Sequence, residues 1–414
     1  MKKIVSGLGK ISMKCKIRPT CYNDSKTMKV KSLLLENIGG IPYLELHNLN
    51  SQMNIICGTN GVGKTNILDA IAYIFSTSDN NVINKRAGSN FGEIVLDIDL
   101  LNEPVSVLVK DFDPDKYTRN RYQLNHNLET ANILYLKVNR VFDYIYQDYI
   151  GQADFSDVRK TTHTKGIDNK DLKEWFVHRI LLSNTQGALN DSELINVKLA
   201  IDSFSILDKN VKFKTVTKYN EIIVNTPTGE IYFEYLSSGF KSTLFIILGI
   251  IKELDYRFSD SHINYLEFEG VILIDEVELH LHPEWQGKIS KILKDIFPKA
   301  QFFITTHSPH IIQTAGQNEV IALERKDDEV IKRTLPKSKY GYQGWTVEEV
   351  LKDVMGMKDL RTELYDSIRK EFIEAFRKQS KKDAKRAFNK LSNMLHPASE
   401  LRAIYQMQLD SLGE

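Results

Sequence analysis

The residues Gly58-Thr-Asn-Gly-Val-Gly-Lys-Thr65 fit the pattern G-x-x-x-x-G-K-[ST] of a phosphate-binding loop, which is the most informative motif in this chain. Glycines in such a loop let backbone N–H groups point at phosphate oxygens without a clash from Cβ, and the helix that follows adds its positive dipole end. Lys64 would reach the β- and γ-phosphates of a nucleotide, and the Thr65 hydroxyl would complete a Mg²⁺ shell. We therefore expect ATP contacts from Gly58, Asn60, Gly61, Gly63, Lys64, Thr65 and Asn66.

The residues on either side place this loop between a strand and a helix. Met53 to Cys57 is a short apolar strand, and Thr65 to Ser76 carries apolar residues at helical spacing. A glycine-rich turn that matched the pattern by chance would lack this setting. Further strands are predicted at 30–35, 41–46, 93–100, 105–110, 133–138, 231–235, 271–275 and 301–305, with helices at 241–258 and 283–297. The alternation predicts an α/β fold with a mixed sheet flanked by helices.

Three regions are expected along the chain. Residues 1–28 show no apolar periodicity and predict a basic, poorly ordered leader. Residues 29–330 form the nucleotide-binding domain, with a partly helical insertion at about 140–210. Residues 331–414 are predicted to be a helical C-terminal region, since Thr346-Val-Glu-Glu349 is a capping-box pattern and apolar residues recur afterwards at steps of three and four.

The composition excludes several classes of protein. Lys and Arg number 55 against 54 Asp and Glu, and 42% of the 414 residues are apolar, which excludes a disordered or collagen-like chain. The three cysteines show no Cys-x-x-Cys spacing, so we expect a reducing cytoplasm and no disulfide framework. The longest apolar run, Leu244 to Ile251, is too short to span a membrane. Both ends are basic, and a lysine face at 378–385 could bind nucleic acid or could simply be solvated.

A second motif supplies acids for the chemistry. Val271-Ile-Leu-Ile-Asp275-Glu276 is an apolar strand that ends in two carboxylates. Beside a phosphate loop, Asp275 would hold Mg²⁺ and Glu276 would polarise the attacking water. A strand that ends in solvated acids is the alternative for this motif taken alone.

Two further segments extend the pattern. Leu236-Ser-Ser-Gly-Phe-Lys-Ser242 begins a predicted helix, where the small residues Ser237, Ser238 and Gly239 could approach a γ-phosphate presented by another subunit. An ordinary serine N-cap is the other interpretation. His307 follows the strand 301–305 within Thr305-Thr-His-Ser-Pro309, where it could sense the γ-phosphate or could be structural.

The four motifs, in this order, resemble those of the ABC-type ATPases of the SMC, RecF and OLD group. Leu35-Glu-Asn-Ile-Gly-Gly-Ile41 is similar to the opening strand and turn of that group, and Glu278-Leu-His-Leu-His-Pro283 to the dimer-facing D-loop of OLD-like ATPases. The resemblance argues against a zinc site at His280 and His282. The resemblance implies a glutamine loop between the phosphate loop and residues 236–242, and Gln147 and Gln152 are both candidates for its glutamine. It also implies a head-to-tail dimer that encloses two ATP molecules. The segment 236–242 resembles the Leu-Ser-Gly-Gly-Gln signature of that group, from which its second serine and Phe240 depart, and we call the helix that it begins the signature helix.

Within this group the chain resembles the PtuA-type ATPases of Septu and retron antiphage systems over about residues 29–400. The compact length and the segments Gly344-Trp-Thr-Val-Glu-Glu-Val350 and Val354-Met-Gly-Met357 carry the likeness. It implies a partner HNH nuclease (PtuB) and, in retron systems, a reverse transcriptase with its DNA–RNA hybrid. It also implies that this chain hydrolyses ATP without being a nuclease itself.

Three other functions remain to be weighed. An OLD-type nuclease needs a strand-borne Glu and an Asp-x-Asp pair after the ATPase, where residues 311–414 offer only Asp327-Asp328. An SMC protein needs a long coiled coil that the sequence does not predict, whereas a RecF-like DNA repair ATPase stays open. An ABC transporter subunit is disfavoured by the departing signature and the basic helical tail.

Overall fold

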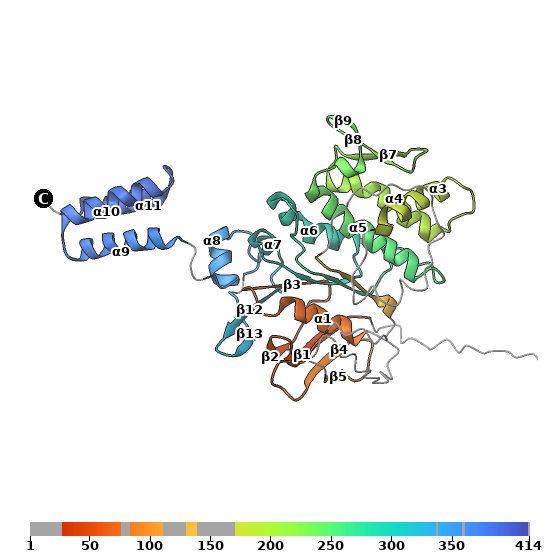
Figure 1. Cartoon of the computed structure of the whole chain (residues 1–414), viewed down its shortest axis with the longest axis horizontal. Helices are drawn as coiled ribbons and strands as arrows, with labels where there is room; N and C mark the ends of the chain where they lie inside the picture. The colour runs from red at the N-terminus through yellow and green to blue at the C-terminus, as the bar shows by residue number, and fades with distance from the viewer. Residues whose placement is uncertain are drawn as a thin grey trace, which may run out of the picture.

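The structure is a computed structural model that describes residues 27–75, 83–110, 130–138, 170–336, 338–357 and 361–412. Two sheets enclose the phosphate-loop helix, helices cover the other side of the larger sheet, and three helices form a separate unit at the C-terminal end (Figure 1). The α/β class with a mixed, helix-flanked sheet is confirmed. No helix in these ranges is both long and apolar enough to cross a membrane.

The central sheet has six strands in the order β13-β12-β3-β11-β10-β6. All neighbours are parallel except β13, which pairs antiparallel with β12. Strands β3, β6, β10 and β11 are buried at every residue, which explains why their sequences are mostly apolar. The strands are β3 (Met53–Gly58), β6 (Ile133–Leu136), β10 (Val271–Ile274), β11 (Gln301–Thr305), β12 (Val320–Lys326) and β13 (Glu329–Lys332).

A second, antiparallel sheet has the order β2-β1-β4-β5. Its strands alternate between buried and partly exposed residues, as expected of a sheet with one covered face. The covered face packs with helix α1 (Lys64–Ile74) and one face of the central sheet in a single hydrophobic core. The strands are β1 (Val30–Ile38), β2 (Ile41–Leu46), β4 (Gly92–Ile98) and β5 (Val105–Val109).

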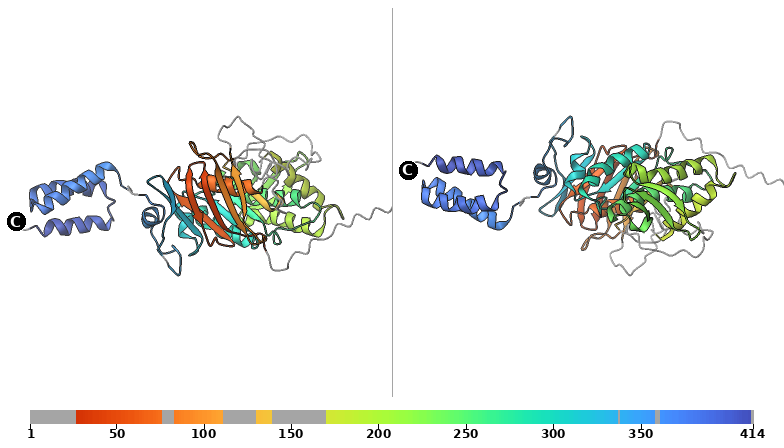
Figure 2. Two further views of the ribbon diagram at one scale, coloured as in Figure 1. Left: turned by 90° about the horizontal axis from the view of Figure 1, so that it is seen from below. Right: turned by 90° about the horizontal axis from the view of Figure 1, so that it is seen from above.

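The opposite face of the central sheet is covered by helices (Figure 2). Helix α5 lies at the centre of this layer and is buried along most of its length, including the run Leu244–Ile251. A small antiparallel sheet, β7-β8-β9, packs beside it. The elements are α3 (Lys170–Ser183), α4 (Asp191–Leu207), α5 (Ser238–Arg257), α6 (Pro283–Ile296), α7 (Pro309–Gln313), β7 (Lys212–Val216), β8 (Ile222–Thr226) and β9 (Gly229–Tyr232), with short 3₁₀ turns η1 (Thr130–Asn132) and η2 (Phe233–Tyr235).

Two element predictions were wrong in part. The predicted strand at 231–235 ends at Tyr232, because the chain turns into η2 and so delivers Leu236 to the start of α5. The region predicted to be helical from residue 331 begins instead with the end of a strand, since β13 runs from Glu329 to Lys332 after a tight turn in which Lys326 pairs with Glu329. Asp327 adopts a positive φ of 54° in this turn.

The C-terminal helices form a unit with its own hydrophobic core, and this unit lies apart from the two sheets in Figures 1 and 2. The predicted capping box at Thr346 and Glu349 is present, but the helix that it starts gives way after one turn to a π-helical turn. The turns α8 (Val347–Glu349) and η3 (Val350–Val354) pack on the main core through Val350 and Val354, and the separate unit consists of α9 (Glu363–Arg377), α10 (Lys381–Met394) and α11 (Glu400–Asp410). Most of the predicted leader, and the part of the predicted insertion (about 140–210) that precedes residue 170, lie outside the described residues, while the rest of the insertion contains α3 and α4.

Candidate active site

The phosphate loop connects β3 to α1 at the carboxyl edge of the central sheet. Gly58 has φ 145°, and a Cβ there would lie 2.3 Å from the carbonyl oxygen of Leu323, so only glycine fits. Gly63 caps α1 with φ 104°, and a Cβ there would lie 2.6 Å from Ile41. Thr59, Asn60 and Gly61 are exposed between them. The loop therefore presents its backbone and the positive end of α1 to solvent, as a phosphate site requires.

Lys64 is 7% exposed and folds back over the loop. Its ammonium donates hydrogen bonds to the carbonyl oxygens of Gly58 at 3.1 Å and Thr59 at 3.2 Å. Partial burial lowers the pKa of Lys64, while Cys57 and the acids Glu278, Asp275 and Glu276 oppose that shift. The carbonyl partners hold the ammonium in the loop, and a phosphate would be a stronger, charged partner for it.

Three oxygen-bearing side chains meet where β10 and β11 end. Thr65 Oγ1 donates to Asp275, with distances of 3.0 and 3.2 Å to the two carboxylate oxygens. Thr305 Oγ1 donates to Asp275 Oδ1 at 2.6 Å. A hydroxyl and a carboxylate beside a phosphate loop fit Mg²⁺, which takes oxygen ligands and keeps several waters.

Glu276 and His307 lie at the same edge of the sheet. Glu276 has φ 46°, a strained conformation for a residue with a side chain, and its N–H donates to Thr305 Oγ1 at 2.7 Å. His307 is exposed, and its backbone N–H donates to the carboxylate of Glu278. Partial burial of the ring and the nearby Lys64 lower the pKa of His307, which favours a neutral imidazole at neutral pH.

The signature segment contacts the D-loop. Ser237 caps α5 by accepting a hydrogen bond from the N–H of Phe240 at 3.3 Å. Gly239 lies so close to the D-loop that a Cβ would be 2.9 Å from the carbonyl oxygen of His280. Ser242 donates to the carbonyl oxygen of Leu279 at 3.0 Å.

The predicted site residues thus fall into two groups. Lys64, Thr65, Asp275, Glu276 and His307 gather at the carboxyl edge of the sheet. Among the described residues, Ser237, Ser238 and Gly239 form no hydrogen bond with this group, and both serines are exposed.

Two further predictions concern histidines and glutamines. His282 caps α6 through its Nδ1, which accepts from the N–H of Glu284 at 3.4 Å, while His280 is exposed. Within the described ranges, no cluster of three or more His, Cys, Asp or Glu side chains could hold a metal ion. Gln147 and Gln152 lie outside the described residues.

Sequence reasoning missed two residues that organise this edge. Thr305 orients both Asp275 and the backbone of Glu276, and Glu278 fixes the backbone of His307. For Thr305, the sequence offered one indication, namely two consecutive threonines at the end of a predicted strand. No pattern in the neighbouring sequence indicates that Glu278 contacts His307, because the two residues are 29 positions apart.

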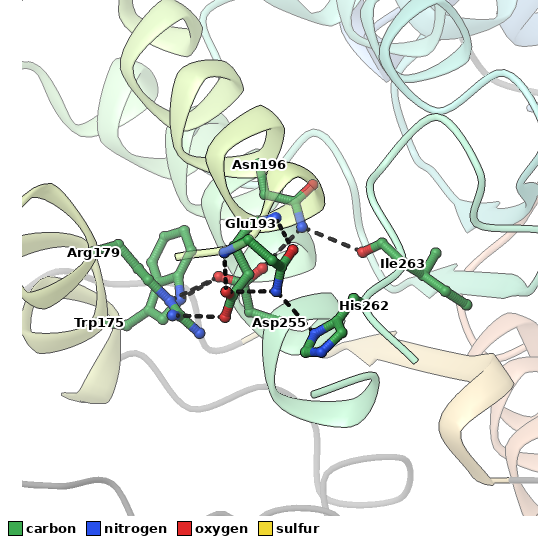
Figure 3. A network of polar contacts seen from close by, with 8 residues as sticks. Trp175, Arg179, Glu193, Asn196, Asp255, His262 and Ile263 are labelled. Atoms are coloured by element: carbon green, nitrogen blue, oxygen red, sulfur yellow. Dashed lines mark hydrogen bonds and ion pairs between the residues drawn. The ribbon is translucent and has the colours of Figure 1, made fainter. Parts of the chain in front are cut away.

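A buried polar network holds the far end of the signature helix (Figure 3). Asp255 on α5 is paired with Arg179 Nε on α3 at 3.0 Å and accepts hydrogen bonds from Trp175 at 3.1 Å and Asn196 at 2.8 Å. Arg179 also pairs with Glu193 on α4 at 3.0 Å. Burial raises the pKa of Asp255, and Arg179 beside it opposes that shift. The network fixes α5 relative to α3 and α4.

The family models and relatives that match this chain include several described as ATPases. A family model described as "AAA ATPase domain" matches residues 28–175, and one described as "AAA domain, putative AbiEii toxin, Type IV TA system" matches residues 123–313. Septu protein PtuA of Bacillus thuringiensis is 39% identical over 400 residues, which cover 93% of this chain and 98% of that protein. Retron Ec83 probable ATPase of Escherichia coli is 25% identical over 391 residues, covering 72% of each. The SMC head domain from Thermotoga maritima is a structural neighbour with 15% identity and a TM-score of 0.39, covering 75% of this chain and 100% of that one.

Proposed function

Because this chain belongs to the family of the Septu protein PtuA, we propose that it is an antiphage-defence ATPase that controls a partner nuclease of the HNH type. The names of its relatives support an ATPase of the Septu and retron kind. On this proposal the chain is not itself a nuclease. In a retron context its complex would also hold a reverse transcriptase with its DNA–RNA hybrid, and the chain would work in the cytoplasm.

The observation that carries the ATPase proposal is the contact between Thr65 and Asp275, which joins the phosphate loop to the acidic strand across 210 residues of sequence. Thr65 and Asp275 would hold Mg²⁺, and this ion would neutralise charge on the β- and γ-phosphates. Lys64 would exchange its carbonyl partners, Gly58 and Thr59, for phosphate oxygens. The exposed backbone of residues 59–61 and the start of α1 would bind the remaining phosphate oxygens.

Hydrolysis requires a base and an ordered water. Glu276 follows the metal-holding Asp275 directly, and its strained backbone is fixed by Thr305. We assign Glu276 as the group that polarises the attacking water and His307 as the group that contacts the γ-phosphate. A neutral imidazole, which the lowered pKa of His307 favours, can donate one hydrogen bond there without adding charge.

The nucleotide would be shared between two copies of the chain. Ser237 and Ser238 are exposed, and in the described part of the chain they form no hydrogen bond with their own phosphate site, so a second copy could contact them. A γ-phosphate that touches both chains favours the closed dimer, and its removal by hydrolysis releases the dimer. This cycle would give the partner nuclease a nucleotide-dependent surface.

The direct test is a pull-down of the tagged full chain, expressed from its native gene neighbourhood, with and without ATP. Co-purification of an HNH nuclease, whose amount or activity changes with nucleotide, is the expected result, and a reverse transcriptase alongside it would indicate a retron. Lys64→Ala is the control that should abolish the dependence on ATP. A clean homodimer without a nuclease, which binds DNA only with ATP, would contradict nuclease control in favour of a RecF-like repair function.

A further inference from the structure

A lysine lies beside the metal-holding aspartate on the neighbouring strand. Strands β6 and β10 are parallel, with Leu136 opposite Ile274, and the N–H of Asp275 donates to the carbonyl oxygen of Leu136 at 2.9 Å. Lys137 and Asp275 are the next residues of the two strands. Their backbones are therefore neighbours at the usual strand separation of about 4.8 Å.

The alternation of side chains indicates that Lys137 and Asp275 point the same way. Tyr135 and Leu273 pack in the core around α1, whereas Leu136 and Ile274 pack in the core on the opposite face. With a period of two, residues 137 and 275 return to the α1 side. The contacts agree, since Asp275 meets Thr65 on α1, and Lys137 Nζ lies 3.3 Å from Asp69 Oδ1 on the same helix.

Asp69 is well placed to hold this lysine next to the phosphate site. It lies four residues after Thr65, on the same face of α1. Its side chain is 13% exposed, and its Oδ1 also accepts a hydrogen bond from the Tyr135 hydroxyl at 3.0 Å. The ammonium of Lys137 lies 4.9 Å from the centroid of the Tyr135 ring and stays partly open to solvent. Asp69 and Tyr135 thus fix the position of an accessible positive charge.

Two lysines therefore approach the acidic edge from different strands. Lys64 comes from the phosphate loop after β3, and Lys137 comes from β6, on the far side of β10 from β3. Thr65 and Asp275 would hold Mg²⁺, which would neutralise charge on the phosphates, so the terminal phosphate of a bound triphosphate would lie near Asp275. A diphosphate would not extend this far.

We propose that Lys137 binds the terminal phosphate of a nucleoside triphosphate and that Asp69 is its positioning residue, so that this pair lets the site distinguish triphosphate from diphosphate. The inference rests on the proposed nucleotide site. The proposed contact is one charge-assisted hydrogen bond from Lys137 to the terminal phosphate. Its loss should lower the affinity for the triphosphate by about 10- to 100-fold.

The experiment measures binding of fluorescent ADP and of a non-hydrolysable fluorescent ATP analogue to the full chain in the presence of Mg²⁺. Lys137→Met should weaken the triphosphate by at least about 10-fold and leave the diphosphate unchanged. Asp69→Asn should give a smaller loss of the same selective kind, and Lys137→Arg should restore part of the affinity. Lys31→Met is the matched control, because it breaks a Lys–Asp pair of 2.7 Å with Asp99 in the other sheet and should change neither affinity.

A second variant guards against a folding defect. The double change of Lys137→Met with Asp69→Asn removes both charges, so no partly buried carboxylate is left without its cation. It should fold and show the same selective loss. Equal weakening of both nucleotides, or triphosphate binding as in the unmodified protein, would overturn the inference.

Lys64→Ala separates this result from a failure of the nucleotide site itself. It should weaken both nucleotides, because Lys64 belongs to the phosphate loop. If Lys64→Ala binds both as the unmodified protein does, the proposed site is wrong. If Lys64→Ala loses binding while Lys137→Met keeps full triphosphate affinity, only the role of Lys137 is wrong.

Discussion

The hydroxyl of Thr305 lies 2.6 Å from Oδ1 of Asp275 and also accepts the backbone N–H of Glu276 at 2.7 Å. One side chain from β11 thus fixes both acids at the end of β10. Thr65 contacts the same carboxylate from α1, so Asp275 is held from two elements. A carboxylate held in this way is prepared to bind a metal ion without rearranging.

Thr305→Val should reduce the Mg²⁺ affinity and the ATPase rate by about 10- to 100-fold, the usual effect of removing a group that orients a metal ligand. The substitution keeps the β-branched shape but leaves the N–H of Glu276 without its acceptor. Titration of the ATPase rate with Mg²⁺ measures the effect. Thr215→Val, on an exposed strand, is the control and should behave like the unmodified protein. An unchanged Mg²⁺ dependence in Thr305→Val would show that Thr305 does not orient the metal ligand.

Glu276→Gln should bind ATP and accumulate as a closed dimer, because the amide cannot polarise the attacking water. We expect turnover to fall by about 100- to 10,000-fold. Size-exclusion chromatography with light scattering, with and without ATP, reports the dimer, and phosphate release reports turnover. Lys64→Ala should stay monomeric in ATP. Dimerisation of Lys64→Ala irrespective of ATP, or normal turnover of Glu276→Gln, would contradict the proposed cycle.

Arg179→Met should destabilise the fold by about 3 kcal/mol or more at neutral pH, because Asp255 would remain buried without its guanidinium partner. Burial already raises the pKa of Asp255, and loss of Arg179 raises it further. A carboxyl whose pKa is higher in the folded than in the unfolded state favours folding when it is protonated. The deficit relative to the unmodified protein should therefore shrink as the pH falls from about 8 to about 5.

Urea unfolding at several pH values measures this difference directly. Lys198→Met is the control, because it removes one positive charge from an exposed position of α4. Its free energy of unfolding should equal that of the unmodified protein at every pH. A deficit for Arg179→Met that is constant across the pH range would mean that Asp255 is not the group responsible.

The exposed lysines of the α9–α10 region give a prediction on nucleic acid. Changing them together to alanine should weaken nucleic-acid binding and lower the slope of log K against log salt by about one for each phosphate that the protein no longer neutralises. The set is Lys378, Lys381, Lys382 and Lys385, all exposed. The same change at four exposed lysines elsewhere, Lys198, Lys209, Lys212 and Lys218, is the control for net charge. An identical slope in both sets would assign the α9–α10 lysines to a solvated face.

The sequence predicts those features that are set by residues close together along the chain. Strands β3, β10 and β11 are mostly apolar because they are buried on both faces, and the phosphate loop follows from its glycine spacing. Strand β13 was missed because it is an edge strand of four residues whose polar side chains, such as Glu329, face solvent. The signature helix was predicted three residues late, because its start is set by the Ser237 cap and by η2, and the apolar run begins further along.

The missed site residues depend on the sheet register. Lys137 is next to Asp275 only because Leu136 pairs with Ile274, and no local pattern states that pairing. Thr305 acts on Asp275 because β11 lies beside β10, 30 residues away in sequence. Such contacts between distant segments need the assembled sheet, whereas motif order alone indicates only that the segments converge.

The D-loop touches the signature helix through Leu279 and Ser242 and touches the backbone of His307 through Glu278. In a dimer, the signature helix of one chain would contact the nucleotide bound by its partner. The D-loop would then couple that contact to His307 and the γ-phosphate at the chain's own nucleotide site. Occupancy of one half-site would raise the affinity of the other. The response to ATP would then be steep, with a Hill coefficient above one, and a nuclease governed by it would change state over a narrow range of nucleotide concentration.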